Sequence, residues 1–142
     1  MSALQIAGAF VRAHESCRLA AYADSGGVWT IGWGHAGEGV HAGLIWTQAQ
    51  ADAQLTADLT AAFDAVIQLT KIPLTESQIA ALISFAFNLG EGALANSTLL
   101  TLINAREFLS AAKEFLRFDH AGGSESKGLL IRRLDEAALF LK

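Results

Sequence analysis

The sequence predicts an α+β fold that is mostly helical, with a small antiparallel β lobe near the N-terminus and a larger helical lobe. Three observations lead to this prediction. Hydrophobic residues make up 52% of the 142 residues and charged residues 17%, which suits one ordinary domain with a sizeable core. Seven glycines fall within residues 26–43, among β-branched and aromatic residues. From residue 47 onward, apolar residues instead recur at helical spacing.

The N-terminal part begins with a short helix and continues into the sheet. Apolar residues recur at helical spacing over residues 3–14, which predicts an amphipathic helix that ends near Glu15. Residues 28–33 are β-branched and aromatic, as is typical of a strand. We therefore expect a twisted antiparallel sheet over residues 19–45, within a β lobe over residues 16–46.

A long helix over residues 47–70 is expected to link the two lobes. Thr47 and Gln50 are spaced as a capping box, in which the two side chains satisfy the first free N–H groups of a helix. Pro73 marks the break after this helix. The helical lobe then covers residues 71–142 together with the N-terminal helix, and a ligand is expected in a cleft between the lobes.

The helical lobe divides into shorter segments at recognisable caps. The residues that signal these caps are Thr75 with Gln78, Gly90, and Ser97. Two further helices are expected over residues 107–118 and 128–142, separated by a turn at residues 122–124. Because there is no long linker and no internal repeat, we predict a single domain over residues 1–142.

Composition and charge exclude several classes of protein. The net charge of −4 disfavours nucleic acid as a partner, since that binding depends on basic residues. No stretch approaches the length of a membrane span, and the first residues lack the basic segment of a signal peptide, so we expect a cytoplasmic protein without stable membrane insertion. Cys17 is the only cysteine and is expected to be a small buried residue. No Cys/His cluster has a ligand-like spacing, so we expect no metal.

Two carboxylates and a hydroxyl lie close together in the chain, at Glu15, Asp24 and Thr30. In glycoside hydrolysis one carboxyl group protonates the leaving oxygen, and another holds or activates a water on the opposite face of the sugar. Each residue also has a simpler interpretation, as a solvated helix-end residue, a turn residue and a strand residue, respectively. His35 follows a glycine and is expected to fix the β lobe by hydrogen bonds.

Around these residues the sequence resembles the phage lysozyme (endolysin) family, the glycoside hydrolases similar to the bacteriophage T4 enzyme, and within it the lambdoid-type branch. The matching motifs extend over nearly the whole chain and include residues 27–35, Phe87-Asn88 and Arg132-Arg133. The spacing of nine and then six residues between the Glu, the Asp and the Thr matches the catalytic triad of the family. The chain departs from the family pattern beside the Glu, where His14 and Ser16 replace the usual Phe and Gly, and at Phe118, where Trp is common.

The resemblance implies a lysozyme-like fold and a muramidase that cleaves the β-1,4 bond between N-acetylmuramic acid and N-acetylglucosamine in peptidoglycan, for host-cell lysis. It implies that Glu15 is the general acid, Asp24 the base-like carboxylate and Thr30 a residue that positions the water. We expect inversion as the outcome. The supporting residues that we expect are His35, Asn88, Arg132 and Arg133. One of the two arginines either pairs with the general acid or lies solvated on a helix face.

Other functions agree less well with the sequence. A catalytically silent wall-binding module would be expected to have a damaged triad, and the triad is intact. A related glycosidase that acts on chitin or chitosan oligomers stays open, because sugar selectivity depends on details of the cleft. A nucleic-acid or protein interaction domain is disfavoured by the lack of a basic face. We expect no cofactor, a monomer, and a protein that stays in the host cytoplasm until a holin gives it access to the periplasm and the cell wall.

Overall fold

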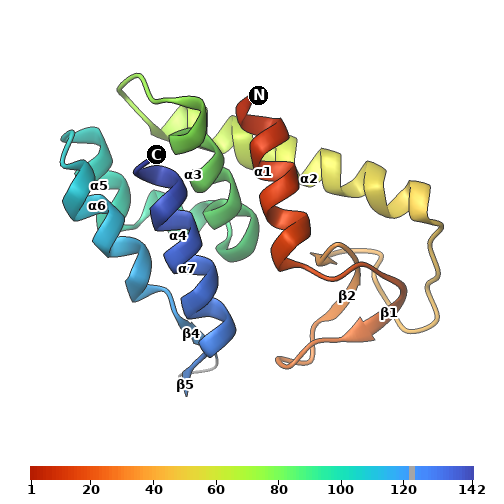
Figure 1. The fold of residues 1–142 in the computed structure, drawn as a ribbon. Coiled ribbons are helices and arrows are strands. Elements are labelled where there is room, and N and C mark those ends of the chain that lie inside the picture. The colour runs from red at the N-terminus through yellow and green to blue at the C-terminus, as the bar shows by residue number, and fades with distance from the viewer. Residues whose placement is uncertain (122–123) are drawn as a thin grey trace. The chain divides into compact units, whose positions relative to one another are not determined.

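The computed structural model describes residues 1–121 and 124–142, and helices dominate it (Figure 1). The predicted mostly helical α+β class is confirmed, because the described strands are few and short. The chain divides into two compact units. We call Gly8–Asp58 the sheet unit, and Met1–Ala7 together with Leu59–Lys142 the helical unit. The helices α1 (Ala3–His14) and α2 (Gln48–Leu69) each contribute residues to both units.

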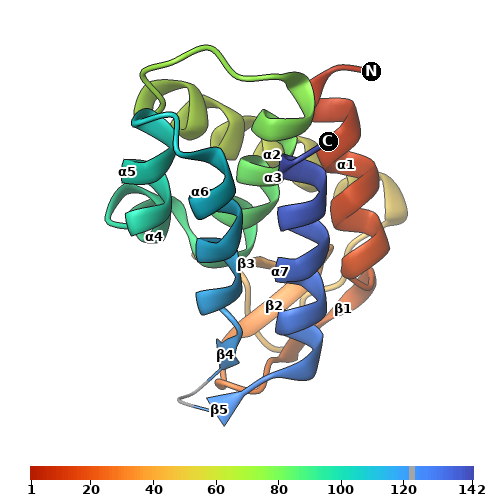
Figure 2. The ribbon, with the colours of Figure 1, turned by 60° about the vertical axis from the view of Figure 1, so that its left-hand side comes forward.

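The sheet unit contains the predicted antiparallel sheet, in the order β1-β2-β3. Its strands are β1 (Arg18–Ala23), β2 (Trp29–Gly32) and β3 (His35–Ala36). Figure 2 shows β1 and β2 side by side, and an irregularity shifts their register between Arg18 and Tyr22. An isolated bridge between Ala20 and Ile45 adds the end of the glycine-rich segment to this sheet. The sheet therefore reaches the predicted limit near residue 45.

Helix α2 begins with the predicted capping box. The Thr47 N–H donates to Gln50 Oε1 at 2.9 Å, and the Gln50 N–H donates to Thr47 Oγ1 at 3.1 Å. These bonds satisfy two donors that a helix start leaves without an intrahelical partner. The helix was expected over residues 47–70 and spans Gln48–Leu69.

The helical unit is built around α3 and α7, with shorter helices beside them (Figure 2). Its further elements are α3 (Glu76–Leu89), α4 (Glu91–Ala95), α5 (Thr98–Asn104), α6 (Phe108–Glu114), η1 (Phe115–Arg117), β4 (His120–Ala121), β5 (Ser124–Glu125) and α7 (Lys127–Phe140). Residues 80–86 of α3 are all buried, so this helix lies in the core. The backbone N–H of Ala3 donates to Glu76 Oε2 at 2.6 Å and joins the start of the chain to the start of α3.

The caps predicted in the helical unit are present. Thr75 and Gln78 form a second capping box at the start of α3. Gly90 has a φ of +97°, and its N–H donates to the carbonyl of Ala86 at 2.8 Å, as expected after a helix C-terminus. The Ser97 hydroxyl accepts a hydrogen bond from the N–H of Leu100 at 3.0 Å. Local sequence therefore determines where α3 and α5 begin.

Two predicted helices have different limits. The segment expected over residues 107–118 ends its α-helix at Glu114 and continues as a 3₁₀ turn. The tighter turn brings Phe115 and Phe118, three residues apart, against the ring of Phe85, with centroid distances of 5.7 and 4.8 Å. The last helix runs over Lys127–Phe140 rather than 128–142 and is capped by the hydroxyl of Ser126. The turn expected at residues 122–124 includes Gly122 and Gly123, which lie outside the described residues.

Candidate active site

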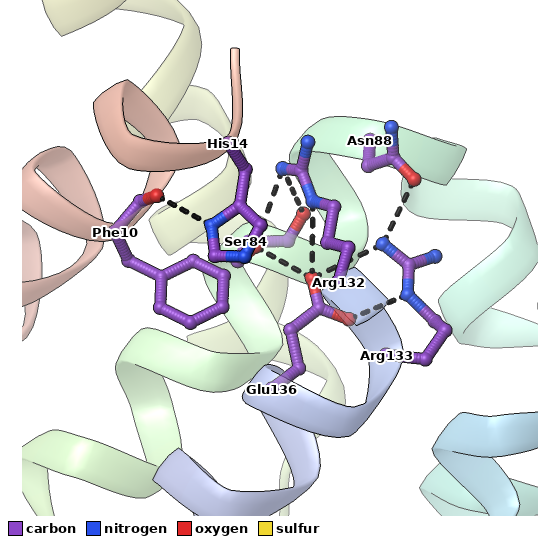
Figure 3. Close-up of polar contacts among 7 residues, drawn as sticks. All are labelled: Phe10, His14, Ser84, Asn88, Arg132, Arg133 and Glu136. Atoms are coloured by element: carbon purple, nitrogen blue, oxygen red, sulfur yellow. Dashed lines mark hydrogen bonds and ion pairs between the residues drawn. The ribbon is translucent and has the colours of Figure 1, made fainter. Parts of the chain in front are cut away.

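Glu15 directly follows α1 and lies against a glycine of the sheet. Its N–H donates to the carbonyl of Val11 at 2.8 Å, so the backbone continues the last helical turn. The preceding His14 stacks on Phe10 with a centroid distance of 4.3 Å, and its Nδ1 lies 2.9 Å from the Phe10 carbonyl (Figure 3). A Cβ atom at Gly34 would come within 3.3 Å of Glu15 Oε2 and 3.4 Å of Cδ. Because Gly34 also has a φ of +92°, this position needs glycine for two separate reasons.

The turn that contains Gly34 is fastened to α2 on both sides. Trp33 Nε1 donates to Asp52 Oδ1 at 2.8 Å. His35 Nδ1 lies 2.8 Å from Asp58 Oδ2, so the hydrogen bond expected for His35 goes to α2. These two bonds flank the glycine and hold its backbone in place beside the carboxyl group of the candidate acid.

Asp52 is the centre of a second set of contacts in the sheet unit. Its Oδ1 also accepts from Gln48 Nε2 at 2.9 Å, and the hydrogen bonds from Trp33 and then Gln48 lower the pKa of Asp52. The guanidinium carbon of Arg12 lies 5.7 Å from the centre of the Trp33 ring. Cys17 was expected to be buried but is half-buried, with its Sγ 3.6 Å from Gln48 Nε2. The anchor of Trp33 is therefore an ionised carboxylate with several partners.

Asp24 occupies the turn between β1 and β2. Its Oδ1 accepts hydrogen bonds from the N–H groups of Gly26 at 2.8 Å and Val28 at 2.9 Å. Gly27 closes the turn with a φ of +79° and donates to the Asp24 carbonyl at 2.9 Å. The side chain is exposed, and Oδ2 accepts no hydrogen bond from the described residues. One oxygen thus fixes the carboxylate and the other faces outward, able to bind a water.

Thr30 lies on the middle strand, paired with Tyr22 of β1 and Ala36 of β3, and is 5% exposed. Its hydroxyl donates to the carbonyl of Val28 at 3.0 Å. Since Asp24 bonds the N–H of the same residue, Val28 links Asp24 to Thr30. The hydroxyl proton of Thr30 is used in this bond, so its oxygen remains as an acceptor.

The other predicted supporting residues, Asn88, Arg132 and Arg133, lie in the helical unit and share one buried network (Figure 3). Arg133 Nε lies 2.8 Å from Glu136 Oε1, and its Nη2 donates to Asn88 Oδ1 at 2.8 Å. Arg132 Nε lies 3.5 Å from Glu136 Oε2. The alternative that these arginines are solvated is wrong, because Arg132 is 4% and Arg133 0% exposed.

Sequence reasoning missed the two residues that organise this network, Glu136 and Ser84. The Ser84 hydroxyl donates to Glu136 Oε2 at 2.5 Å, and both side chains are fully buried. Burial raises the pKa of Glu136, against the opposing influence of Arg133, Ser84 and Arg132. Burial also lowers the pKa of Arg133. The spacing of Glu136 three and four residues after the arginines was the available signal, since such pairs share a helix face.

Neither a metal-binding cluster nor a membrane-spanning helix is present among the described residues. Residues 1–121 and 124–142 contain no group of three or more His, Cys, Asp or Glu side chains placed to hold a metal ion. Within these same ranges, none of the helices combines the length and the apolar character needed to cross a bilayer.

The fold is that of a phage lysozyme. The solved structure of an endolysin from the Escherichia coli O157:H7 phage FAHEc1 superposes with a TM-score of 0.88 at 31% identity, covering 100% of this chain and 94% of that one. The family model described as phage lysozyme matches residues 12–136. The chain therefore belongs to the phage lysozyme family.

Relatives with known names agree with this assignment. The chain is 39% identical over 135 residues to the endolysin of Salmonella phage P22, covering 92% of each chain. It is 41% identical over 133 residues to the endolysin of Bacillus phage B103, covering 92% of this chain. The matched region is 51% of the Bacillus phage protein, so the chain spans about half the length of that relative.

Proposed function

We propose that this protein is a peptidoglycan hydrolase, a muramidase of the endolysin type, which cleaves the β-1,4 bond between N-acetylmuramic acid and N-acetylglucosamine for host-cell lysis. The observation that carries the proposal is the arrangement in the sheet unit. Asp24 and Thr30 are linked through Val28, and Glu15 lies against Gly34 in the same unit. Membership of the phage lysozyme family supports the choice of substrate.

Glu15 is the proposed general acid, which protonates the glycosidic oxygen as the bond breaks. Glu15 is half-buried, and its carboxyl group has the Gly34 backbone along one side. The Gly34 backbone limits the positions that the Glu15 carboxyl group can adopt. This favours catalysis, because a proton donor has to be held in a narrow range of positions relative to the leaving oxygen.

Asp24 and Thr30 are the proposed partners of the attacking water. The bonds to Asp24 Oδ1 fix the carboxylate, and its Oδ2 faces outward to accept a proton from the water. The Thr30 hydroxyl donates its hydrogen bond to the carbonyl of Val28, so its oxygen supplies a second acceptor for the water. We propose inversion, which requires the two carboxyl groups to stand ~6.5–9.5 Å apart so that a water fits between them and the sugar.

The supporting residues have separate proposed roles. His35, through Asp58, and Trp33, through Asp52, keep the Gly34 turn beside the acid. Asn88 and Glu136 hold Arg133, and Ser84 and Glu136 hold Arg132. We propose that Arg132 and Arg133 are supporting residues, so that shortening either side chain lowers turnover more than substrate binding.

The test is clearing of chloroform-permeabilised Gram-negative cells by the parent protein and by Glu15→Gln, which keeps the shape but has no proton to donate. Glu38→Gln is the matched control, because Glu38 is an exposed carboxylate in the same unit. We expect Glu15→Gln to be about 10²–10⁴-fold slower and the control to equal the parent. Equal clearing by all three proteins would refute the assignment of the acid.

Three further measurements separate the alternatives. A parent protein that folds and binds cell walls without clearing cells would indicate a wall-binding module. Faster cleavage of chitin oligomers than of purified peptidoglycan would indicate the related glycosidase. The anomeric form of the first product, followed by NMR, distinguishes inversion from retention.

Access to the wall is a separate proposal. We expect a monomer that stays in the host cytoplasm until a holin permeabilises the membrane. Expression with and without a holin tests this. Lysis only with the holin supports it, and lysis without one refutes it.

A further inference from the structure

A small hollow at the start of α2 is not used by the proposed catalytic residues. It is lined by Trp46, Gln50, Ala53 and Gln54, which we call the amide pocket, and its volume is about 320 Å³. Ligand pockets span roughly 300–1,000 Å³, so this one has room for a single small group and not for an oligomer. All four residues belong to the sheet unit.

Trp46 is a fixed aromatic wall of the amide pocket. The ring packs so closely on the sheet that a Cβ at Gly32 would fall 3.1 Å from its Cζ3. The ring of His35 lies beside it, with a centroid distance of 5.8 Å. The indole is only half-buried, so part of its surface remains open to a ligand. An indole held in this way offers apolar contact to methyl groups or to the C–H groups of a sugar.

The two glutamines present opposite hydrogen-bonding groups. Gln50 uses its Oε1 to accept from the Thr47 N–H at 2.9 Å, which leaves its NH₂ group as a donor. Gln54 uses its Nε2 to donate to Asp58 Oδ1 at 2.9 Å, which leaves its Oε1 as an acceptor. Since the residues are four apart on one helix, the donor and the acceptor lie on the same face.

We infer that the amide pocket binds the acetamido group of an N-acetylhexosamine. The acetamido carbonyl accepts from the Gln50 NH₂, and the acetamido N–H donates to Gln54 Oε1. The methyl group packs against Trp46 and Ala53. A carboxylate, which only accepts, would match Gln50 alone. A hydroxyl could bond both glutamines but brings no methyl group to Trp46 and Ala53, so the acetamido group is the better match.

The choice of sugar rests on the proposed function, because peptidoglycan carries an acetamido group on every hexosamine. None of the pocket residues is a proposed catalytic residue. The amide pocket therefore binds a sugar at a second position on the glycan strand, away from the bond that is cleaved.

The probe is the N-acetylglucosamine trimer, titrated into the full chain and followed by NMR. The signals to follow are the side-chain amides of Gln50 and Gln54 and the indole N–H of Trp46. The glucosamine trimer, which has no acetyl groups, is the control ligand. We expect these three signals to shift with the acetylated trimer only. Unchanged signals, or equal shifts with both trimers, would overturn the inference.

Gln50→Glu is the decisive variant. The carboxylate still accepts the Thr47 N–H, so the helix cap is kept, but the donor to the ligand is lost. Gln78→Glu makes the same substitution in the other capping box and is the matched control. We expect Gln50→Glu to weaken binding at the Gln54 and Trp46 signals about tenfold, and Gln78→Glu to leave it unchanged. Equal binding by parent and Gln50→Glu would contradict the inference.

Clearing of cells separates this inference from the proposed function. If the parent shows the expected shifts but clears no cells, the amide pocket stands and the proposed hydrolysis fails. If cells are cleared and the three signals do not move, the proposed function stands and the amide pocket fails.

Discussion

The carboxyl group of Glu15 lies against Gly34, so closely that a single added carbon would come within 3.3 Å of its Oε2. Glu15 directly follows α1, and Gly34 lies in the turn between β2 and β3. Placement of the candidate acid thus depends on a backbone that carries no side chain at this point.

Gly34→Ala should reduce clearing of permeabilised cells at least about tenfold, because the new methyl group displaces the carboxyl group of Glu15. It should also destabilise the fold by ~1–2 kcal/mol, since alanine is strained at positive φ. Gly39→Ala is the control, because Gly39 has a similar φ of +85° and nothing within 4 Å of its Cβ position. Equal activity in the two variants, at equal stability in urea, would show that the contact with Glu15 does not matter.

Trp33→Phe should make the free energy of unfolding depend less on pH in the acidic range. The Trp33 hydrogen bond is the largest cause of the lowered pKa of Asp52, and a lowered carboxyl pKa contributes stability above the ordinary aspartate value. That contribution is lost as pH falls through the lowered pKa. In urea unfolding, the parent should therefore exceed the variant at pH 7, by a margin that shrinks below pH ~4. Trp29→Phe, at a ring that is 39% exposed, should show no such change of margin with pH.

Glu136→Gln should gain stability relative to the parent as pH rises. The pKa of Glu136 is raised by burial, so its contribution to stability is complete below the ordinary glutamate value and is lost as pH rises through the raised pKa. The glutamine does not titrate. Free energies of unfolding for both proteins, measured in urea from pH 4 to pH 8, give the sign directly. If the parent instead becomes more stable than the variant as pH rises, pairing with Arg132 and Arg133 affects the pKa of Glu136 more than burial does.

Ser84→Ala should destabilise the protein by ~1–3 kcal/mol. The variant loses the hydroxyl that donates to Glu136 Oε2 and accepts from Arg132 Nη2, and it leaves these buried charged groups with fewer partners. Ser110→Ala, at an exposed position of α6, should change stability by less than ~0.5 kcal/mol. Thermal or urea unfolding of both variants at one pH measures the difference. Equal losses of stability in the two variants would show that the Ser84 hydroxyl does not stabilise the network.

Elements set by local chemistry could be predicted from the sequence. Both capping boxes involve residues only three apart, so Thr47 and Thr75 indicate the starts of α2 and α3 without any knowledge of the fold. The limits of α6 could not be found in this way, because they depend on Phe115 and Phe118 packing against the distant Phe85. Helix α4, with only five residues, carries too little periodicity to be recognised.

In the candidate site, too, residues close in sequence could be predicted and distant partners could not. Glu15, Asp24 and Thr30 are close in sequence and match a family spacing, so they could be named in advance. Their surroundings could not, because the partners lie far along the chain. Asp52 is 19 residues from Trp33, and Glu136 is 52 residues from Ser84. Carboxylates on helices are common, and the spacing of Glu136 from the two arginines indicates a shared helix face but not burial.

The helical unit takes its first seven residues from one end of the chain and the rest from beyond residue 58. Ala3 and Ala7 are buried, and the Ala3 N–H bonds to Glu76. During synthesis on the ribosome, the segment Gly8–Asp58 emerges as one continuous piece. Residues 1–7, although made before that segment, have to wait for α3 before they can be buried. Residues 1–7 therefore reach their final place only after residues that the ribosome adds much later.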